Sequence, residues 1–201
     1  MPGFRRFCFL IALFAAPLAQ AGTQQYEPLS ASVRSAMSRS IAEQNHARLV
    51  FSDPQNAYEW LLAMSKKLEK RIPDTAYRVE LLKTIHYEAT RAGLDPQLVL
   101  GIIQVESGFK KYAVSKAGAR GLMQVMPFWI NLIGSKDQHN LFNLRTNLRF
   151  GCTILRHYLD IEKGNLFRAL GRYNGSLGRA EYPRLVMAAW KGTFRYDGPV
   201  A

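Results

Sequence analysis

The chain has 201 residues, 48% of them hydrophobic, and a formal net charge of +12. This length and hydrophobic content suit one globular domain with a substantial core. So much core argues against a short basic peptide that disrupts membranes. The excess of positive charge favours a polyanionic partner: nucleic acid, an anionic membrane or a negatively charged wall polymer.

The first 21 residues have the features of a cleavable export signal. Arg5 and Arg6 form a short positive region, residues 7–18 are almost entirely apolar, and Ala19-Gln20-Ala21 has the small-x-small pattern of a cleavage site. The apolar run is shorter than the about 20 residues of a membrane-spanning helix. We therefore expect cleavage after Ala21 and a periplasmic protein, with an uncleaved membrane anchor as the alternative.

Export narrows the choice of partner and of redox chemistry. It makes nucleic acid the least favoured of the polyanions. Removal of the signal leaves Cys152 as the one cysteine, so no intramolecular disulfide can form. Cys152 occupies an apolar position in a helical stretch, which predicts a small core residue and not a nucleophile.

Apolar residues recur at helical spacing throughout the rest of the sequence, which predicts an all-α fold. Asp53-Pro54, Pro73-Asp74 and Asp95-Pro96 resemble helix starts, with a capping residue beside a proline. Residues 98–105 are apolar nearly all round, as in a buried central helix. The expected helices cover 30–47, 53–68, 73–93, 96–106, 145–161, 166–173 and 182–190, and a short one begins near Gly121.

The chemical cues are unevenly distributed along the chain. Residues 22–72 carry few of them and are interpreted as an N-terminal helical extension. Residues 73–201 carry the motifs described below and are interpreted as the main domain. Whether the two parts share one core is left open.

Glu106 is the leading candidate for chemistry. It ends the predicted buried helix and is followed by Ser107-Gly108-Phe109. The negative pole of the helix dipole and apolar neighbours such as Ile103 and Val105 both disfavour the ionised carboxylate. Both effects raise the pKa of the carboxyl group, as a general acid at neutral pH requires. A solvated glutamate at a helix end is the alternative.

The segment after Glu106 adds a second group of polar residues. Residues 113–115 read Ala-Val-Ser, and residues 118–127 read Gly-Ala-Arg-Gly-Leu-Met-Gln-Val-Met-Pro. Two glycines three residues apart predict a tight turn or a close backbone approach. A buried glutamine near a glutamate must be engaged in hydrogen bonds. We infer that Gln124 and Glu106 face one polar cleft.

These segments together resemble the signature of the soluble lytic transglycosylases. The resemblance rests on residues 106–109, 113–115 and 118–124, on the stretch 140–151, and on Arg172-Tyr173-Asn174-Gly175. It covers about residues 85–190, with the motifs in the family's order. It implies a lysozyme-like helical domain, here residues 73–201, that cuts the β-1,4 bond between N-acetylmuramic acid and N-acetylglucosamine in peptidoglycan.

The resemblance also implies a role for each matching residue. Glu106 would be the sole catalytic acid and base. Ser115 would hold the N-acetyl group of the substrate, and Gln124 and Met126 would line the saccharide cleft. Tyr173 and Asn174 would close the cleft near Glu106. The products would end in 1,6-anhydro-N-acetylmuramic acid, formed with the help of the substrate's own N-acetyl group.

The residue inventory agrees with a single carboxyl group. Ordinary glycosidases need two carboxyl groups beside the bond, yet no second one lies within the motifs. Glu88, on another predicted helix, stays open as a second carboxylate. The four histidines lack metal-ligand spacing, so we expect no metal and no cofactor.

Other functions and partners remain as alternatives. A lysozyme-type hydrolase would make the same cut with water as the acceptor. A wall-binding or secretion-assembly protein would keep the cleft without turnover. We expect a monomer that binds glycan strands and no nucleic acid. Contact with the cell envelope, or with a secretion or division machinery, is left open.

Overall fold

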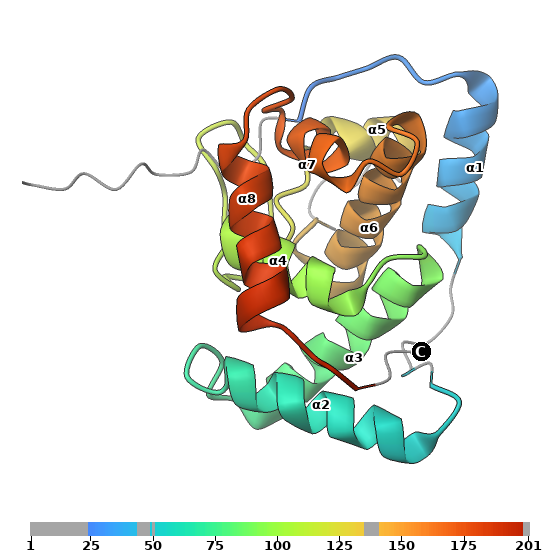
Figure 1. Ribbon diagram of the computed structural model, residues 1–201. Helices are drawn as coiled ribbons and strands as arrows, with labels where there is room; N and C mark the ends of the chain where they lie inside the picture. The colour runs from blue at the N-terminus through green and yellow to red at the C-terminus, as the bar shows by residue number, and fades with distance from the viewer. Residues whose placement is uncertain (1–23, 44–48, 50, 135–140, 199–201) are drawn as a thin grey trace, which may run out of the picture.

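A computed structural model describes residues 24–43, 49, 51–134 and 141–198 (Figure 1). These residues form helices and connecting loops without a β-strand, which confirms the predicted all-α fold. The helices are α1 (Ala31–Ala42), α2 (Pro54–Leu68), α3 (Thr75–Arg91), α4 (Pro96–Glu106), α5 (Phe128–Ile133), α6 (Leu144–Ile161), α7 (Leu166–Asn174) and α8 (Glu181–Ala188), which continues into a π-helical turn, η2 (Ala189–Thr193).

The predicted helix starts at acidic capping residues are confirmed. The side chains of Asp53, Asp74 and Asp95 each accept a hydrogen bond from a backbone N–H in the first turn of α2, α3 and α4. Proline follows Asp53 and Asp95 directly, where its missing N–H costs no hydrogen bond. These helix starts depend only on residues that are neighbours in the sequence, which is why they could be predicted from it.

Two predicted elements differ from the structure. The short helix expected near Gly121 is absent, because Gly121 and Gln124 have positive φ angles of 77° and 49° and residues 121–124 form turns. The first helix was expected to continue to residue 47, but α1 ends at Ala42. Glu43 is extended there, and its carboxylate reaches Arg91 at 3.3 Å. Residues 44–48 lie outside the described part.

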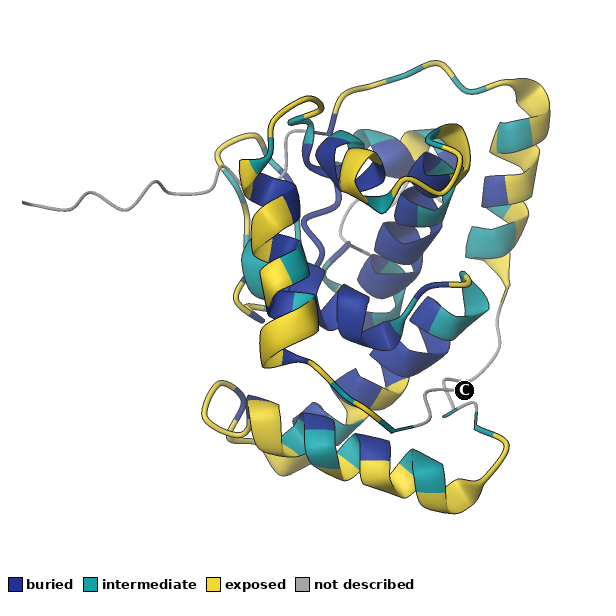
Figure 2. Ribbon diagram, viewed as in Figure 1, coloured by how far each residue is buried: buried dark blue, intermediate teal, exposed yellow. Residues whose placement is uncertain are grey.

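Helix α4 lies at the centre of the fold, as predicted from its apolar composition. Nearly all of its residues are buried, and it packs against α8 and η2 (Figure 2). Gly101 makes this close packing possible. A Cβ atom at this position would come within 3.1 Å of the Trp190 nitrogen and the Val186 carbonyl. The C-terminal end of α4, which carries Glu106, is thereby held deep inside the molecule.

The N-terminal helices contribute to the same hydrophobic cluster as the rest. Trp60, Met64 and Leu68 of α2 are fully buried in it, and α1 adds Met37. The Trp60 indole also donates to Gln97 of α4 at 3.2 Å. The predicted boundary between residues 72 and 73 remains a prediction, but the two sides share a core. Cys152 is fully buried there, which confirms its predicted core position.

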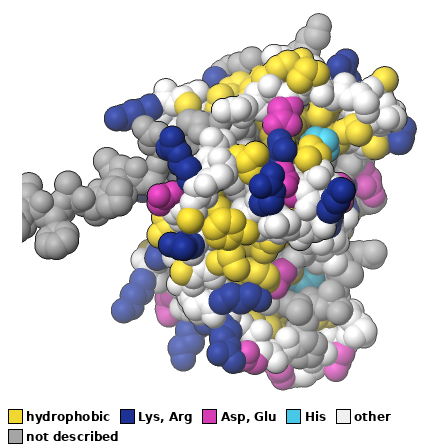
Figure 3. Space-filling view, turned by 45° about the horizontal axis from the view of Figure 1, so that its top comes forward, with side chains coloured by type: hydrophobic (Ala, Val, Ile, Leu, Met, Phe, Trp, Pro, Cys, Tyr) yellow, Lys and Arg dark blue, Asp and Glu magenta, His cyan; other side chains and the backbone are white. Residues whose placement is uncertain are grey.

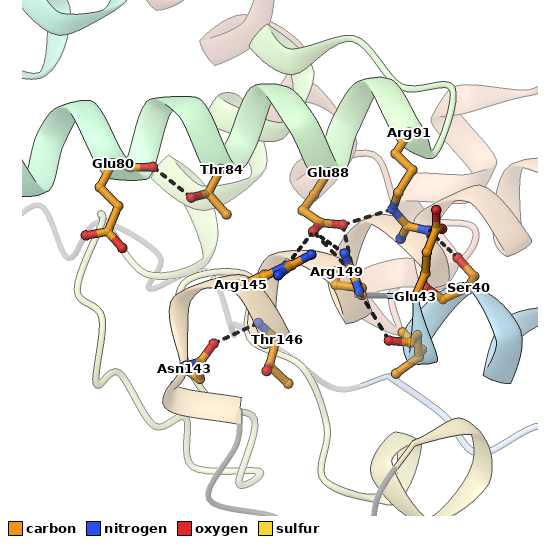
Figure 4. Close-up of polar contacts among 11 residues, drawn as sticks. Ser40, Glu43, Glu80, Thr84, Glu88, Arg91, Asn143, Arg145, Thr146 and Arg149 are labelled. Carbon is orange, nitrogen blue, oxygen red and sulfur yellow. Dashed lines mark hydrogen bonds and ion pairs between the residues drawn. The ribbon is translucent and has the colours of Figure 1, made fainter. Parts of the chain in front are cut away.

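An ion-pair cluster around Glu88 joins α1, α3 and α6 (Figure 4). The carboxylate of Glu88 is fully buried and contacts Arg149 at 2.9 Å, Arg91 at 3.1 Å and Arg145 at 3.7 Å. Arg91 also donates to the Ser40 hydroxyl of α1 at 2.8 Å. A charge buried this deeply requires such partners. Glu88 therefore has a structural role, which argues against the second catalytic carboxylate that the sequence left open.

One face of the molecule carries its positive charge in a dispersed form. Figure 3 shows Lys and Arg side chains spread over one face, with acidic side chains between them. No helix in the described part of the chain is long and apolar enough to cross a membrane. The predicted export signal, residues 1–21, lies outside the described residues.

Candidate active site

Glu106 is the last residue of α4, and the sequence after it turns the chain away sharply. Ser107 leaves the helical conformation, and its hydroxyl donates to the Ile103 carbonyl at 3.2 Å. Gly108 and Phe109 follow with positive φ angles of 57° and 69°. Phe109 is buried against Phe194, with ring centroids 6.0 Å apart. This turn leaves the Glu106 side chain inside the protein, with 5% of the residue exposed.

Burial dominates the acidity of Glu106. It raises the pKa of the carboxyl group from 4.5 to about 8, while the neighbouring Tyr182 hydroxyl and Asn174 side chain oppose the rise to a smaller extent. The predicted upward shift of the pKa is therefore confirmed, with desolvation as its main cause. The group is protonated at neutral pH, which a general acid requires.

The two neighbours approach the Glu106 carboxyl group from the last helices. Asn174 ends α7 and is 5% exposed, and Tyr182 lies in the first turn of α8 and is 4% exposed. Both are near enough to change the pKa of Glu106. Among the described residues, however, neither carboxyl oxygen nor the Tyr182 hydroxyl has a hydrogen bond of acceptable geometry. Proximity suffices for an electrostatic effect, whereas a hydrogen bond also requires alignment.

Tyr182 was missed by the sequence reasoning. Its position in an amphipathic segment is typical of a core aromatic, and nothing local distinguishes it from one. Only the packing of α8 against α4 brings it to Glu106. Asn174, in contrast, was predicted, and the structure brings it to Glu106. Helix α7 ends at Asn174, and Gly175 follows in a left-handed conformation, φ 77°, as is common for a glycine directly after a helix.

The segment 113–125 forms a compact loop that is held by its own backbone. Isolated antiparallel bridges join Val114 to Arg120 and Arg120 to Val125. Gln124 is 1% exposed and lies inside this loop. Its side-chain nitrogen donates to the Ala113 carbonyl at 3.1 Å and to the Gly121 carbonyl at 2.8 Å. The structure thus places Gln124 as a brace of the loop, with its amide nitrogen occupied by backbone.

Two residues from other helices fix this loop in space. Asn147 of α6 accepts from the Met123 N–H at 2.8 Å and donates to the Arg120 and Leu141 carbonyls at 2.8 and 2.9 Å. The Tyr173 hydroxyl of α7 donates to the Met123 carbonyl at 2.8 Å. Tyr173 is fully buried, and its pKa is raised by burial and, to a smaller extent, by Glu106. Tyr173 therefore links the loop to the surroundings of Glu106.

Ser115 is half-buried at the start of the same loop. Its hydroxyl oxygen accepts from the Ala119 N–H at 3.1 Å, and its backbone N–H donates to the Ala119 carbonyl at 3.0 Å. Accepting one bond leaves the hydroxyl hydrogen available for donation. The geometry therefore fits a residue that donates to a carbonyl oxygen outside the loop.

Met126 follows the loop and has an unexpected partner. Its backbone N–H donates to the side-chain oxygen of Gln24 at 3.3 Å, and the Trp129 indole donates to the same oxygen at 3.0 Å. Gln24 belongs to the segment before α1 and is 4% exposed. No local pattern in the sequence signals this long-range contact.

The other acidic residues behind Glu106 in the sequence are engaged elsewhere or exposed. Asp160 pairs with Arg156, Glu162 with Arg168 and Arg172, and Asp197 with Arg195, while Glu181 is exposed at the start of α8. Asp137 lies outside the described residues. Within the described part, no three His, Cys, Asp or Glu side chains gather as metal ligands would.

Comparison with known proteins gives a consistent set of relatives. The family model of the Transglycosylase SLT domain matches residues 83–184, about half of the chain. A transglycosylase of Enterobacteria phage PRD1 is 34% identical over 125 residues, which cover 59% of this chain and 46% of the phage protein. The membrane-bound lytic murein transglycosylase C of Histophilus somni strain 2336 is 38% identical over 112 residues, or 48% of this chain and 31% of that protein.

A solved structure also aligns with part of this chain. An inactive mutant of the lytic transglycosylase Slt from Pseudomonas aeruginosa aligns with 65% of this chain and 22% of its own chain, at 26% identity and a TM-score of 0.46. The present chain spans less than half the length of each of these relatives.

Proposed function

Because the chain belongs to the Transglycosylase SLT domain family, we propose that it is a peptidoglycan lytic transglycosylase with Glu106 as its single acid and base. The observation that carries this proposal is the burial of Glu106, which raises the pKa of its carboxyl group to about 8. Such a group holds a proton at neutral pH, and within the described part of the chain its oxygens have no hydrogen bond of acceptable geometry. It is suited to donate that proton to a glycosidic oxygen.

In the first step, the Glu106 proton passes to the oxygen that links N-acetylmuramic acid to N-acetylglucosamine. The bond from the anomeric carbon to this oxygen breaks, and the N-acetyl oxygen of the muramic acid attacks the same carbon. A cyclic oxazolinium ion results, and Glu106 is left as a carboxylate. Ser115 would orient the acetamide by donating its free hydroxyl hydrogen to it.

In the second step, the Glu106 carboxylate takes the proton of the C6 hydroxyl of the same sugar. The C6 oxygen attacks the anomeric carbon, the oxazolinium ring opens, and the 1,6-anhydro ring forms. Glu106 is protonated again and ready for another cycle. Attack within one sugar gains from proximity, for which effective molarities reach about 10⁵–10⁸ M.

The inventory of described carboxylates supports a reaction with a single one. Glu88 is enclosed by three arginines, and the other described acids after Glu106 are paired or exposed. The substrate's own N-acetyl oxygen would replace the missing nucleophile. Tyr173 and Asn174 are buried and each interacts electrostatically with Glu106, while Met126 directly follows the loop 113–125 in the sequence. Gln124 would act by shaping this loop.

The proposed place of action is the periplasm, where peptidoglycan lies. The relatives include proteins described as membrane-bound murein transglycosylases. The apolar N-terminal segment with its Ala19-Gln20-Ala21 pattern supports export. The positive charge of the chain suits a negatively charged wall polymer.

Product analysis tests the proposal. Purified sacculi are digested with the mature chain, reduced with borohydride and weighed by mass spectrometry. Anhydro ends resist reduction, so after this treatment they are lighter than hydrolytic ends by one water and two hydrogens. Glu106→Gln serves as the matched control and should lose about 10²–10⁴-fold in rate, because its amide cannot donate the proton. Mostly reducible ends would identify a lysozyme-type hydrolase, and no soluble product would favour a wall-binding protein.

A further inference from the structure

Residues 24–29, here called the N-terminal strap, run over the proposed cleft before the chain enters α1. Figure 1 shows this blue segment crossing the end of the molecule where α5 and α7 lie. Leu29 is partly buried against the hydrophobic core, and three other side chains make specific contacts with the main domain. Gln24 bonds to Met126 and Trp129, Tyr26 stacks edge-on against Phe128, and Glu27 pairs with Arg172.

The Gln24 contact differs from the other two in depth. Tyr26 is 59% exposed and the Glu27 side chain 41% exposed, so both anchors lie at the surface. Gln24 is 4% exposed, and its carbonyl oxygen accepts two hydrogen bonds at once. Its amide nitrogen is buried and has no hydrogen bond of acceptable geometry to any residue that the structure describes. A buried amide nitrogen that lacks a partner is costly, so the site is better matched to the carbonyl than to the NH₂ group.

The site that holds Gln24 adjoins the surroundings of the catalytic acid. The Gln24 amide lies close enough to the Tyr173 hydroxyl to lower its pKa slightly, and Glu106 raises the pKa of the same hydroxyl. Met126 and Tyr173 are two of the residues that the family resemblance places in the saccharide cleft. Gln24, the first residue of the strap, therefore lies among the residues that the glycan would have to reach.

The burial of Glu106 also indicates that part of the protein must move before a glycan can bind. A polysaccharide must contact this carboxyl group, yet 5% of the residue is exposed. Some buried element has to move before the substrate can bind. The outer anchors of the strap are weak enough for it to do so, since an exposed ion pair contributes only about 0–1 kcal/mol.

We propose that the strap competes with the glycan, and that the side-chain amide of Gln24 occupies a position that an N-acetyl group of the substrate takes during turnover. Both groups are planar amides whose carbonyl oxygen can accept from the Met126 N–H and the Trp129 indole. An N-acetyl group carries one N–H where glutamine carries an NH₂ group, so it would bury less unpartnered polar surface. The strap must leave for the substrate to enter, and the closed structure is the resting form.

The inference rests on the proposed function, but its test does not require cleavage. The mature chain and its Gln24→Ala variant are titrated calorimetrically with a β-1,4-linked tetramer of N-acetylglucosamine. Gln25→Ala is the matched control, because Gln25 is the same residue type in the same strap and is exposed. Loss of the Gln24 hydrogen bonds opens the cleft, so affinity should rise roughly tenfold in Gln24→Ala and stay unchanged in Gln25→Ala.

A second variant loosens the strap without touching the amide site. Glu27→Gln removes the ion pair with Arg172 and should raise affinity in the same direction by a smaller factor. If Gln24 only supports Met126 and Trp129, Gln24→Ala will bind the tetramer more weakly than the unaltered chain, which would overturn the proposal. Equal affinity would also overturn it. Cleavage of sacculi by the unaltered chain, measured separately, decides the proposed function whatever the strap does.

Discussion

Relative to the unaltered protein, Glu106→Gln should become increasingly stable as the pH rises, although it should slow the proposed reaction by about 10²–10⁴-fold. The pKa of this carboxyl group is raised from 4.5 to about 8 in the folded protein. The folded state therefore binds the proton more tightly than the unfolded state. The free energy of unfolding falls as the pH rises through the window between these two values. The loss begins near pH 4.5 and is complete above pH 8.

The size of the effect follows from the shift of the pKa. Each pKa unit corresponds to about 1.4 kcal/mol. Linkage then gives a destabilisation of the unaltered protein by roughly 1 kcal/mol at pH 5 and roughly 4 kcal/mol at pH 8. Glutamine does not titrate in this range, so the stability difference between variant and parent should grow by about 3 kcal/mol between the two pH values. For a chain of this length, that difference corresponds to about 6–12 °C in Tm.

The change with pH of the stability difference between variant and parent is the informative quantity. The difference at any single pH also contains the cost of burying the glutamine NH₂ group. The glutamine NH₂ group would enter a pocket where neither glutamate oxygen has a well-aligned hydrogen bond. An unpartnered buried group costs about 1–3 kcal/mol at every pH. Thermal unfolding is therefore followed from pH 5 to pH 8 for the parent, for Glu106→Gln and for a control, Glu181→Gln, whose side chain is exposed. A Tm difference for Glu106→Gln that stays constant over this range would refute the buried, protonated carboxyl group.

The remaining predictions concern activity, stability and processing. The rate of sacculus cleavage should decline on the alkaline side near pH 8, where Glu106 loses its proton; an alkaline limit near pH 5 would contradict its role as acid. Ser115→Ala should slow cleavage roughly tenfold through loss of one hydrogen bond, and a loss as large as that of Glu106→Gln would assign Ser115 more than positioning. Glu88→Gln should lower the free energy of urea unfolding by about 3–5 kcal/mol, because it breaks a buried ion-pair cluster; unchanged stability would disprove that role. N-terminal sequencing of exported protein should begin at Gly22, and a Met1 start would exclude cleavage.

The sequence could predict the features whose causes are local. Asp53 and Asp95 cap helices that begin with proline, and both starts appear where expected. The apolar surface of residues 98–105 predicted the buried central helix that the structure contains. The direction of the pKa shift of Glu106 followed from the apolar neighbours on its own helix. In each case the information lies within a few residues of the feature.

The sequence failed where contacts from distant elements decide the conformation. A Cβ atom at Gly121 would lie 2.3 Å from the Asn147 side chain and 2.6 Å from the Leu141 carbonyl. These neighbours, from α6 and the loop before it, favour a turn where a helix was expected. The approach of Tyr182 to Glu106 and the insertion of Gln24 next to Met126 depend in the same way on packing between elements. Neither contact has a signature in spacing or composition.

For the proposed function, the burial of Glu106 presents a conflict that the proposed exchange of strap for glycan would resolve. The pKa of about 8 comes from exclusion of water, but a group shielded from water is also shielded from a polymer. If departure of the strap admitted water to Glu106, the pKa of its carboxyl group would fall toward 4.5, and the proposed reaction would lose its acid. If a glycan takes the place of the strap, its sugar rings exclude water in turn and keep the pKa high. A strap that yields only to a substrate of matching shape would therefore keep the acid protonated both at rest and during the reaction.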